Sequence, residues 1–267
     1  MKKVLSVAGS DCSGGAGIQA DLKTFSAHGV FGMSVIISVV AENTSRVIDF
    51  QDVSSDIIRK QFDAVFEDIE VDAVKIGMLS SAVCMQAVHG KLLEYAPRNI
   101  VIDPVMCAKN GAPLMDPSAI SCLIDLIIPR ADILTPNIPE AEKIAGMAIG
   151  TLQDMERAAA AIHSMGCHNV LIKGGHSQGD AVDVLFDGKA YSYFSAPRVD
   201  TKNTHGTGCT YSSAIASNLA LGHPVHHAID LAKGYINMAI AHSLDIGRGN
   251  GPTNHFYDLY RHGLAQS

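Results

Sequence analysis

Short apolar runs rich in Val and Ile alternate along this chain with longer stretches of helical periodicity. The runs predict strands at Val4–Ala8, Met33–Val40, Val71–Ile76, Ile100–Ile102, Ile133–Thr135 and Val170–Ile172. Apolar residues spaced three and four apart predict helices over about 15–28, 55–68, 81–95, 117–128, 138–146, 152–165, 209–221 and 224–243. Strands that alternate with helices are typical of βαβ units, so the predicted fold class is α/β with a largely parallel sheet.

The pattern changes late in the chain. Val182–Phe186 and Ala190–Phe194 flank the turn sequence Asp187-Gly188, which predicts an antiparallel hairpin. No repeat, low-complexity segment or Pro/Ser-rich linker interrupts the sequence, and one large α/β domain can hold 267 residues. We therefore expect a single domain over residues 1–267 whose mixed sheet has an antiparallel pair.

Polar or glycine-containing segments follow most of the predicted strands. In doubly wound sheets, ligands bind beyond the carboxyl ends of the strands, so these segments predict one shared crevice. They are Gly9-Ser10-Asp11, Ala41-Glu42-Asn43-Thr44, Gly77-Met78, Asp103-Pro104, Pro136-Asn137 and Lys173-Gly174-Gly175-His176.

The turn from Asn203 to Thr210 contains Gly206 and Gly208 and leads directly into a predicted helix. Glycines let successive backbone N–H groups point into one concavity, and the helix adds its unpaired N–H groups and the positive end of its dipole. This favours an anion site in which the thiolate of Cys209 is stabilised. The alternative is a flexible loop before a helix with an inert, buried cysteine.

A second glycine-rich segment lies near the start of the chain. Gly15 to Ala20 satisfies the dinucleotide pattern G-x-G-x-x-A, but the preceding strand ends near Ala8, too early for the tight turn of that fingerprint. The lysine of a Walker A loop is also missing. The segment is better interpreted as a close approach of the backbone to a small ligand, or as a helix cap that includes Asp21.

Two carboxylates and a lysine complete the candidate chemistry. Asp103 and Glu140 each follow a buried strand, where oxygen ligands suit Mg²⁺ carried by a nucleotide; either could instead cap a helix. Lys173 with Gly174-Gly175 offers a cation and open N–H groups to phosphate.

Composition narrows the function classes. A net charge of −7, a pI near 5.9 and the absence of Trp argue against a nucleic-acid surface. No run approaches the roughly 18 apolar residues of a membrane span. The six cysteines form no C-x-x-C pair, which favours free thiols in a reducing, cytoplasmic compartment.

Taken in order, these motifs resemble the hydroxymethylpyrimidine and phosphomethylpyrimidine kinases of thiamin biosynthesis, which belong to the ribokinase-like superfamily. The resemblance spans Val4 to about Phe256 and implies a three-layer α/β/α fold. The segments that carry it are Ala8–Lys23, Lys75–Leu79, Asp103–Met106, Thr135–Glu142, Lys173–His176 and Asn203–Thr210.

The resemblance implies transfer of the ATP γ-phosphate, with Mg²⁺, to 4-amino-5-hydroxymethyl-2-methylpyrimidine and then to its monophosphate. It makes Cys209 the catalytic base and places Gly206 and Gly208 in the anion hole. The other roles it implies are pyrimidine contacts from Gly9, Asp21, Glu42, Met78 and Val105, ATP contacts from Asn137, Lys173, Thr207 and Lys233, and Mg²⁺ contacts from Asp103 and Glu140. A lid at Ala108–Met115 and a homodimer are further implications.

One position departs from the family pattern, because many members carry Gln where this chain has Glu42. A Gln side chain both donates and accepts hydrogen bonds, whereas an ionised Glu only accepts. Our hypothesis is that Glu42 accepts from the exocyclic amine of the pyrimidine and favours protonation of a facing ring nitrogen.

Pyridoxal kinases of the same branch are the closest alternative. They resemble this chain but carry a lid cysteine two residues after the Met of D-P-V-M, where this chain has Ala108; its cysteine is Cys107. A binding protein without catalysis is a second alternative, but it predicts loss of the chemistry-bearing residues, which are present. A sugar kinase is a third, although its usual Gly-Ala-Gly-Asp is Gly206-Thr207-Gly208-Cys209 here.

Overall fold

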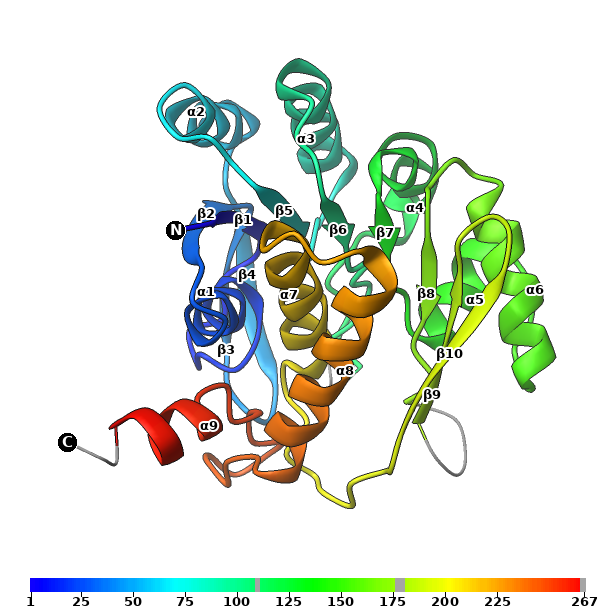
Figure 1. Cartoon of the computed structure of the whole chain (residues 1–267). Coiled ribbons are helices and arrows are strands. Elements are labelled where there is room, and N and C mark those ends of the chain that lie inside the picture. Colours follow the sequence, from blue (N-terminus) through cyan, green and yellow to red (C-terminus); the bar gives the residue numbers. More distant parts are fainter. Residues whose placement is uncertain (109–110, 176–180, 265–267) are drawn as a thin grey trace.

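The computed structural model describes residues 1–108, 111–175 and 181–264. Within these ranges, eight strands form one sheet in the order β10-β9-β8-β7-β6-β5-β1-β2 (Figure 1). The strands from β8 to β2 pair in parallel, and β9 pairs antiparallel with both of its neighbours, β8 and β10. Their bounds are β1 Lys3–Ala8, β2 Phe31–Ile36, β5 Ala73–Ile76, β6 Ile100–Ile102, β7 Ile133–Leu134, β8 Val170–Ile172, β9 Ala181–Phe186 and β10 Tyr191–Ala196.

Helices cover both faces of this sheet and complete three layers, as expected (Figure 1). One face carries α1 Gly17–Ala27, α7 Thr207–Ala220 and α8 Val225–Ala241. The other carries α2 Ser55–Phe66, α3 Ala82–Tyr95, α4 Ile120–Cys122, α5 Ile138–Ala145 and α6 Leu152–His163. The antiparallel edge hairpin is also confirmed, with Asp187-Gly188 between its strands.

Two cores result from the alternation of side chains along the strands. Ile100 and Ile102 face the layer of α2 to α6, whereas Val101 between them packs in the core of α1, α7 and α8. Ser6 and Lys75 occupy the α1/α7 side of β1 and β5, where they meet Asp21 of α1. The two-residue period thus places a lysine inside an otherwise apolar strand.

The prediction of one strand over Met33–Val40 is wrong, because the chain leaves the sheet after β2. The Gln61 side chain accepts from Ile36 N at 2.9 Å and donates to Ile36 O at 3.1 Å, which satisfies this edge. Beyond Ile37, β3 Ser38–Glu42 pairs instead with β4 Val47–Asp52 in a separate antiparallel sheet. This two-stranded sheet carries Glu42 to the ligand-binding edge.

The predicted helix over 117–128 is a series of short turns in the structure. A 3₁₀ turn at Pro117–Ala119, the single turn α4, a π-helical turn at Leu123–Ile127 and a 3₁₀ turn at Ile128–Arg130 follow one another. Near the C-terminus, α9 Tyr257–Leu259 leads into a π-helical turn at Tyr260–Leu264. No helix among the described residues is long and apolar enough to cross a membrane.

Candidate active site

A cavity of about 510 Å³ lies at the carboxyl ends of the parallel strands. Of the predicted site residues, all except Asp21 line it. They come from segments that are far apart in the chain: Gly9, Glu42, Met78, Asp103, Val105, Asn137, Glu140, Lys173, Gly206, Thr207, Gly208, Cys209 and Lys233. The expectation of one shared crevice is therefore confirmed.

The glycine-rich turn forms the start of α7. Gly206 is the N-cap and adopts φ 77°, a left-handed conformation that favours glycine, and it has no side chain to bond the N–H groups of the first turn. A Cβ on Gly208 would lie 3.2 Å from Asp103 Oδ2 and 3.5 Å from Lys173 Nζ. The turn therefore presents backbone N–H groups beside a lysine and a carboxylate, as a phosphate cradle requires.

Cys209 stands in the first turn of α7 and lines the cavity. Burial raises the pKa of its thiol to about 11; Lys75 opposes this shift, while Asp21 and Asp103 add to it. The expected stabilisation of the thiolate is thus wrong for this structure, because burial and two carboxylates outweigh the nearby lysine. The thiol carries its proton at neutral pH.

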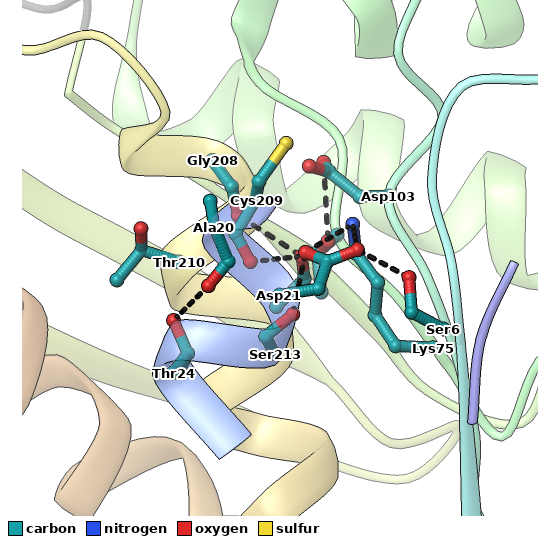
Figure 2. Close-up of polar contacts among 12 residues, drawn as sticks. Ser6, Ala20, Asp21, Thr24, Lys75, Asp103, Gly208, Cys209, Thr210 and Ser213 are labelled. Atoms are coloured by element: carbon teal, nitrogen blue, oxygen red, sulfur yellow. Dashed lines mark hydrogen bonds and ion pairs between the residues drawn. The ribbon is translucent and has the colours of Figure 1, made fainter. Parts of the chain in front are cut away.

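Asp21 lies behind Cys209 instead of lining the cavity (Figure 2). Its carboxylate is 0% exposed and accepts from Lys75 Nζ at 2.9 Å, and from the hydroxyls of Ser6 at 2.5 Å and Ser213 at 2.7 Å. The prediction of a pyrimidine contact from Asp21 needs correction, because protein donors surround both oxygens. Asp21 joins α1, β1, β5 and α7 beneath the cradle.

Asp103 and Lys173 form an ion pair that faces the cavity beside Gly208. Lys173 Nζ lies 2.7 Å from Asp103 Oδ1, and Thr135 Oγ1 donates to the same oxygen at 3.4 Å. Burial works against the lysine charge, but Asp103 and Glu140 outweigh it and raise the pKa of Lys173. A permanent cation therefore stands beside the cradle.

Asn137 and Glu140 form a capping box at the start of α5. Glu140 N donates to Asn137 Oδ1 and Asn137 N donates to Glu140 Oε2, both at 2.9 Å. Burial raises the pKa of Glu140 to about 7; Lys173 opposes this shift and Asp103 adds to it. Glu140 thus caps a helix, which was the alternative to a Mg²⁺ ligand, and it also lines the cavity.

Lys233 of α8 reaches the cavity but is already bonded within the protein. It donates to Asp183 Oδ2 at 2.6 Å and to Ala181 O at 3.0 Å. Asp183, which sequence reasoning missed, also accepts from Tyr211 Oη at 3.0 Å and from Gly174 N at 2.9 Å. The sequence signal that could have identified Asp183 is its position between Val182 and Val184 in an otherwise apolar strand.

The opposite end of the cavity is apolar and carries one carboxyl group. Val40, Met78 and Leu114 form a small cluster there, joined by Val105. A Cβ on Gly9 would lie 3.0 Å from Met78 Sδ, so glycine at this position leaves room for the Met78 side chain. This lining suits a flat heterocycle, since an apolar wall with few polar groups orients such ligands.

Glu42 supplies the carboxyl group at this end. Burial raises its pKa to about 7; Asp11 adds to this shift and His205 opposes it. Sequence reasoning quoted Asp11 and His205 within motifs but gave them no role. Oxygen or nitrogen atoms of the three residues lie within 4.8 Å of one another, as metal ligands would.

A metal is disfavoured there because Asp11 is already saturated with donors. Its Oδ2 accepts from Gly15 N at 2.9 Å, Ala16 N at 2.7 Å and His205 Nε2 at 2.9 Å, and its Oδ1 accepts from Ser13 N at 2.7 Å. Asp11 is therefore the centre of a hydrogen-bond network between two loops.

Part of the expected lid borders the cavity. Cys107, Ala108 and Leu114 line it, and Cys107 forms a β-bridge with Pro113. Residues 109 and 110 of the lid segment lie outside the described residues, as does His176 of the Lys173–His176 motif. Because both Cys107 and Ala108 reach the cavity, the one-residue shift of the cysteine does not remove it from the site.

The sequence comparisons agree on one family. The family model described as Phosphomethylpyrimidine kinase matches residues 11–254. The hydroxymethylpyrimidine/phosphomethylpyrimidine kinase of Bacillus subtilis is 45% identical over 95% of this chain and 94% of its own length. A thiamine biosynthesis bifunctional protein of Geobacter sulfurreducens is 52% identical over 94% of this chain, which spans only 52% of that relative.

Solved structures give two similar folds. The ADP complex of Bacillus subtilis pyridoxal kinase has a TM-score of 0.89 at 39% identity and covers 96% of this chain and 98% of its own. A phosphomethylpyrimidine kinase from Clostridium difficile has a TM-score of 0.81 at 48% identity and covers 90% of this chain and 100% of its own.

Proposed function

The chain belongs to the phosphomethylpyrimidine kinase family of phosphotransferases, and we propose that it transfers the γ-phosphate of ATP to hydroxymethylpyrimidine and then to its monophosphate. The observation that carries the proposal is the division of one cavity into two ends. An apolar end with Glu42 suits the aminopyrimidine, and the Gly206–Cys209 turn with Lys173 suits the phosphates. Cys209 lines the same cavity, in the first turn of α7.

Phosphoryl transfer asks a protein mainly for positioning and for stabilisation of charge. The first-turn N–H groups of α7 and the Lys173 ammonium group provide that stabilisation at the cradle. Asn137, Thr207 and Lys233 add further polar atoms to the same wall. We assign this end of the cavity to the nucleotide phosphates.

The donor set at the phosphate end fits Mg²⁺. Asp103 and Glu140 supply the hard oxygen atoms that this ion prefers, and Mg²⁺ commonly binds proteins through one or two carboxylates together with phosphates and water. Asp103 and Glu140 would hold the ion, which would neutralise charge on the transferred phosphate. Lys173 orients Asp103 through their 2.7 Å contact.

Cys209 is our proposed acceptor for the proton of the substrate hydroxyl. Its reactive form is the thiolate, which is a small fraction at neutral pH because the pKa of the thiol is about 11. Because the pKa of the thiol is so high, the thiolate binds the incoming hydroxyl proton strongly. In the transfer step, the hydroxyl oxygen bonds to the γ-phosphorus, ADP leaves, and the hydroxyl proton passes to the sulfur.

Parallel assays of ADP formation test the proposal. We expect turnover with hydroxymethylpyrimidine and with its monophosphate, each dependent on Mg²⁺, and detection of the diphosphate product by mass spectrometry. Tight binding of the pyrimidine without ADP formation would instead support the non-catalytic binder.

Pyridoxal is the second candidate substrate, because the Cys107 thiol lines the cavity and the fold is similar to that of a pyridoxal kinase. A thiol in that place can add reversibly to an aldehyde. A kcat/KM for pyridoxal above that for the pyrimidine would reverse our assignment. Cys107→Ala separates the two, since it should lower turnover of pyridoxal and leave turnover of the pyrimidine unchanged.

A homodimer is part of the proposal, and the sheet of β3 and β4 is its best-supported interface. On this two-stranded sheet Val39 is 58% exposed, Ile48 is 62% exposed and Phe50 is 39% exposed, with Val39 and Phe50 on opposite faces. Such a concentration of exposed apolar side chains is typical of interaction surfaces. Light scattering should give twice the chain mass, and Ile48→Glu should shift it toward the monomer.

We also propose that the chain acts as one kinase domain over residues 1–267 in the cytoplasm. Both cores pack on the same sheet, which supports one folding unit. All six cysteines are free thiols, which suits a reducing compartment where ATP is present. A single cooperative unfolding transition and recovery of activity in the cytosolic fraction are the expected results.

A further inference from the structure

Two loops from opposite ends of the chain are in direct contact at the floor of the cavity. A Cβ on Gly206 would overlap the carbonyl oxygen of Gly15, and a Cβ on Gly15 would overlap the His205 ring. Glycines on both sides therefore allow the backbones to meet. One loop leads into α1 beside the proposed pyrimidine end, and the other begins α7 with Cys209 in its first turn.

A buried aspartate holds these loops together. Asp11 is 1% exposed and accepts from three backbone N–H groups of its own loop and from His205 Nε2 at 2.9 Å. Burial works against its charge, but hydrogen bonds from His205, Ser13 and Ala16 lower the pKa of Asp11 to about 2. The acceptor is thus ionised at neutral pH.

His205 is held from both sides. Its ring nitrogen Nε2 is committed to Asp11, while its backbone N–H donates to Gly251 O at 3.0 Å and its carbonyl accepts from Thr253 N at 3.4 Å. The next residue is Gly206, the N-cap of α7. The position of the imidazole therefore sets where the cradle begins relative to the pyrimidine loop.

We propose that Asp11 and His205 form a positioning pair that locks the pyrimidine loop to the phosphate cradle. The pair keeps the substrate hydroxyl aligned with the γ-phosphate and leaves water less room to attack it. Neither residue is assigned contact with the reacting atoms, and the inference rests on the proposed kinase function.

If the pair aligns the substrate hydroxyl with the γ-phosphate, its loss should change particular kinetic constants. A displacement of about 1 Å between reacting groups can lower a rate about 100-fold, even when each ligand still binds. Loss of the pair should therefore lower kcat more than it raises the KM for ATP. It should also raise the ratio of ATP hydrolysis to phosphate transfer, because a misaligned phosphate is exposed to water.

The test compares His205→Ala, His205→Gln and the control His168→Ala in the full chain. Gln keeps an N–H donor for Asp11, whereas Ala removes it. His168 forms a similar bond, from Nδ1 to Asp132 Oδ1 at 3.0 Å, but is largely exposed and does not line the cavity. For each protein, kcat, both KM values and the rates of ATP hydrolysis and transfer are measured.

We expect His205→Ala to lower kcat at least 30-fold, to change the KM for ATP less than threefold, and to raise the hydrolysis-to-transfer ratio about tenfold. His205→Gln should recover most of both effects, and His168→Ala should match the wild type. The ratio does not depend on how much of a variant is folded, so it remains informative if His205→Ala is unstable.

An unchanged ratio in His205→Ala would overturn the proposal, as would equal effects of His205→Ala and His205→Gln on the ratio. Failure of the kinase proposal itself is distinguishable, because the wild type would then form no phosphorylated pyrimidine.

Discussion

Two Lys–Asp ion pairs act on Cys209 from different places. Asp21–Lys75 is 0% exposed at both side chains and is sealed behind the thiol (Figure 2), whereas Asp103–Lys173 lines the cavity beside the cradle. Both aspartates raise the pKa of the Cys209 thiol. The Lys–Asp distances are similar, at 2.9 and 2.7 Å. We therefore attribute the different roles of the two pairs to what surrounds each pair.

The sealed pair has no atom left for a ligand. Asp21 receives Lys75 and two serine hydroxyls, and its removal from water is offset only by these bonds. The cavity pair is only partly satisfied by protein and lines the cavity, where we propose that phosphate and Mg²⁺ bind. We infer that Asp21–Lys75 holds the site together and that Asp103–Lys173 takes part in its chemistry.

The largest effect should come from the thiol between the pairs. Cys209→Ala should lower kcat by about 100- to 10,000-fold, the range for loss of a general base, while the KM for ATP stays within about threefold. In the wild type, kcat should rise about tenfold per pH unit from neutral pH towards the Cys209 pKa of about 11, because the thiolate fraction rises by that factor.

Steady-state kinetics over this pH range provide the measurement. Cys209→Ser is the matched control, because it keeps the size of the side chain. Equal losses in kcat and in ATP affinity for Cys209→Ala would mean that the residue only shapes the cradle.

Breaking the sealed pair should mainly cost stability. Lys75→Met leaves the Asp21 carboxylate buried without its cation, which typically costs about 3–5 kcal/mol of unfolding free energy. Urea unfolding measures this loss. The double variant Asp21→Asn/Lys75→Met should recover part of it, and a Lys75→Met protein of normal stability with low kcat would reverse the roles of the two pairs.

Breaking the cavity pair should mainly cost activity. Lys173→Met removes the cation at the cradle and should lower kcat by about 100- to 1,000-fold, as loss of one preorganised charge-stabilising donor does. Its loss of unfolding free energy should be smaller than that of Lys75→Met, because Asp103 borders the cavity and can regain water. Lys173→Arg, which keeps the charge, is the control.

The smallest effect should come from Glu42, which belongs to neither pair. Because its pKa is about 7, the Glu42 carboxyl loses its proton as the pH rises through 7. The proton that Glu42 and the aminopyrimidine edge share at lower pH is then no longer available to hold the two together. The KM of the wild type for the pyrimidine should therefore rise up to about tenfold from pH 6 to 8. Glu42→Gln should give a flat profile, whereas matching profiles would exclude the shared proton.

Local sequence signals predicted most helices and several of their ends. The hairpin turn Asp187-Gly188 was predicted in this way, because its residues are near neighbours, and the structure adds the equally local capping boxes Thr151–Asp154 and Asn137–Glu140. The departure of the chain from the sheet after Ile36 depends instead on Gln61 of α2. A partner 25 residues away leaves no local trace in the apolar run Met33–Val40.

For the site, the sequence by itself determined which chemical groups are present and that they follow successive strands, since the carboxyl ends of parallel strands share one edge. Only the tertiary structure decided which groups face the cavity. Asp21 and Asp103 are both aspartates beside a lysine, yet one is enclosed by four elements and the other faces the cavity. Burial, charge pairing and the meeting of Asp11 with His205, 194 residues apart, arise from packing between distant segments.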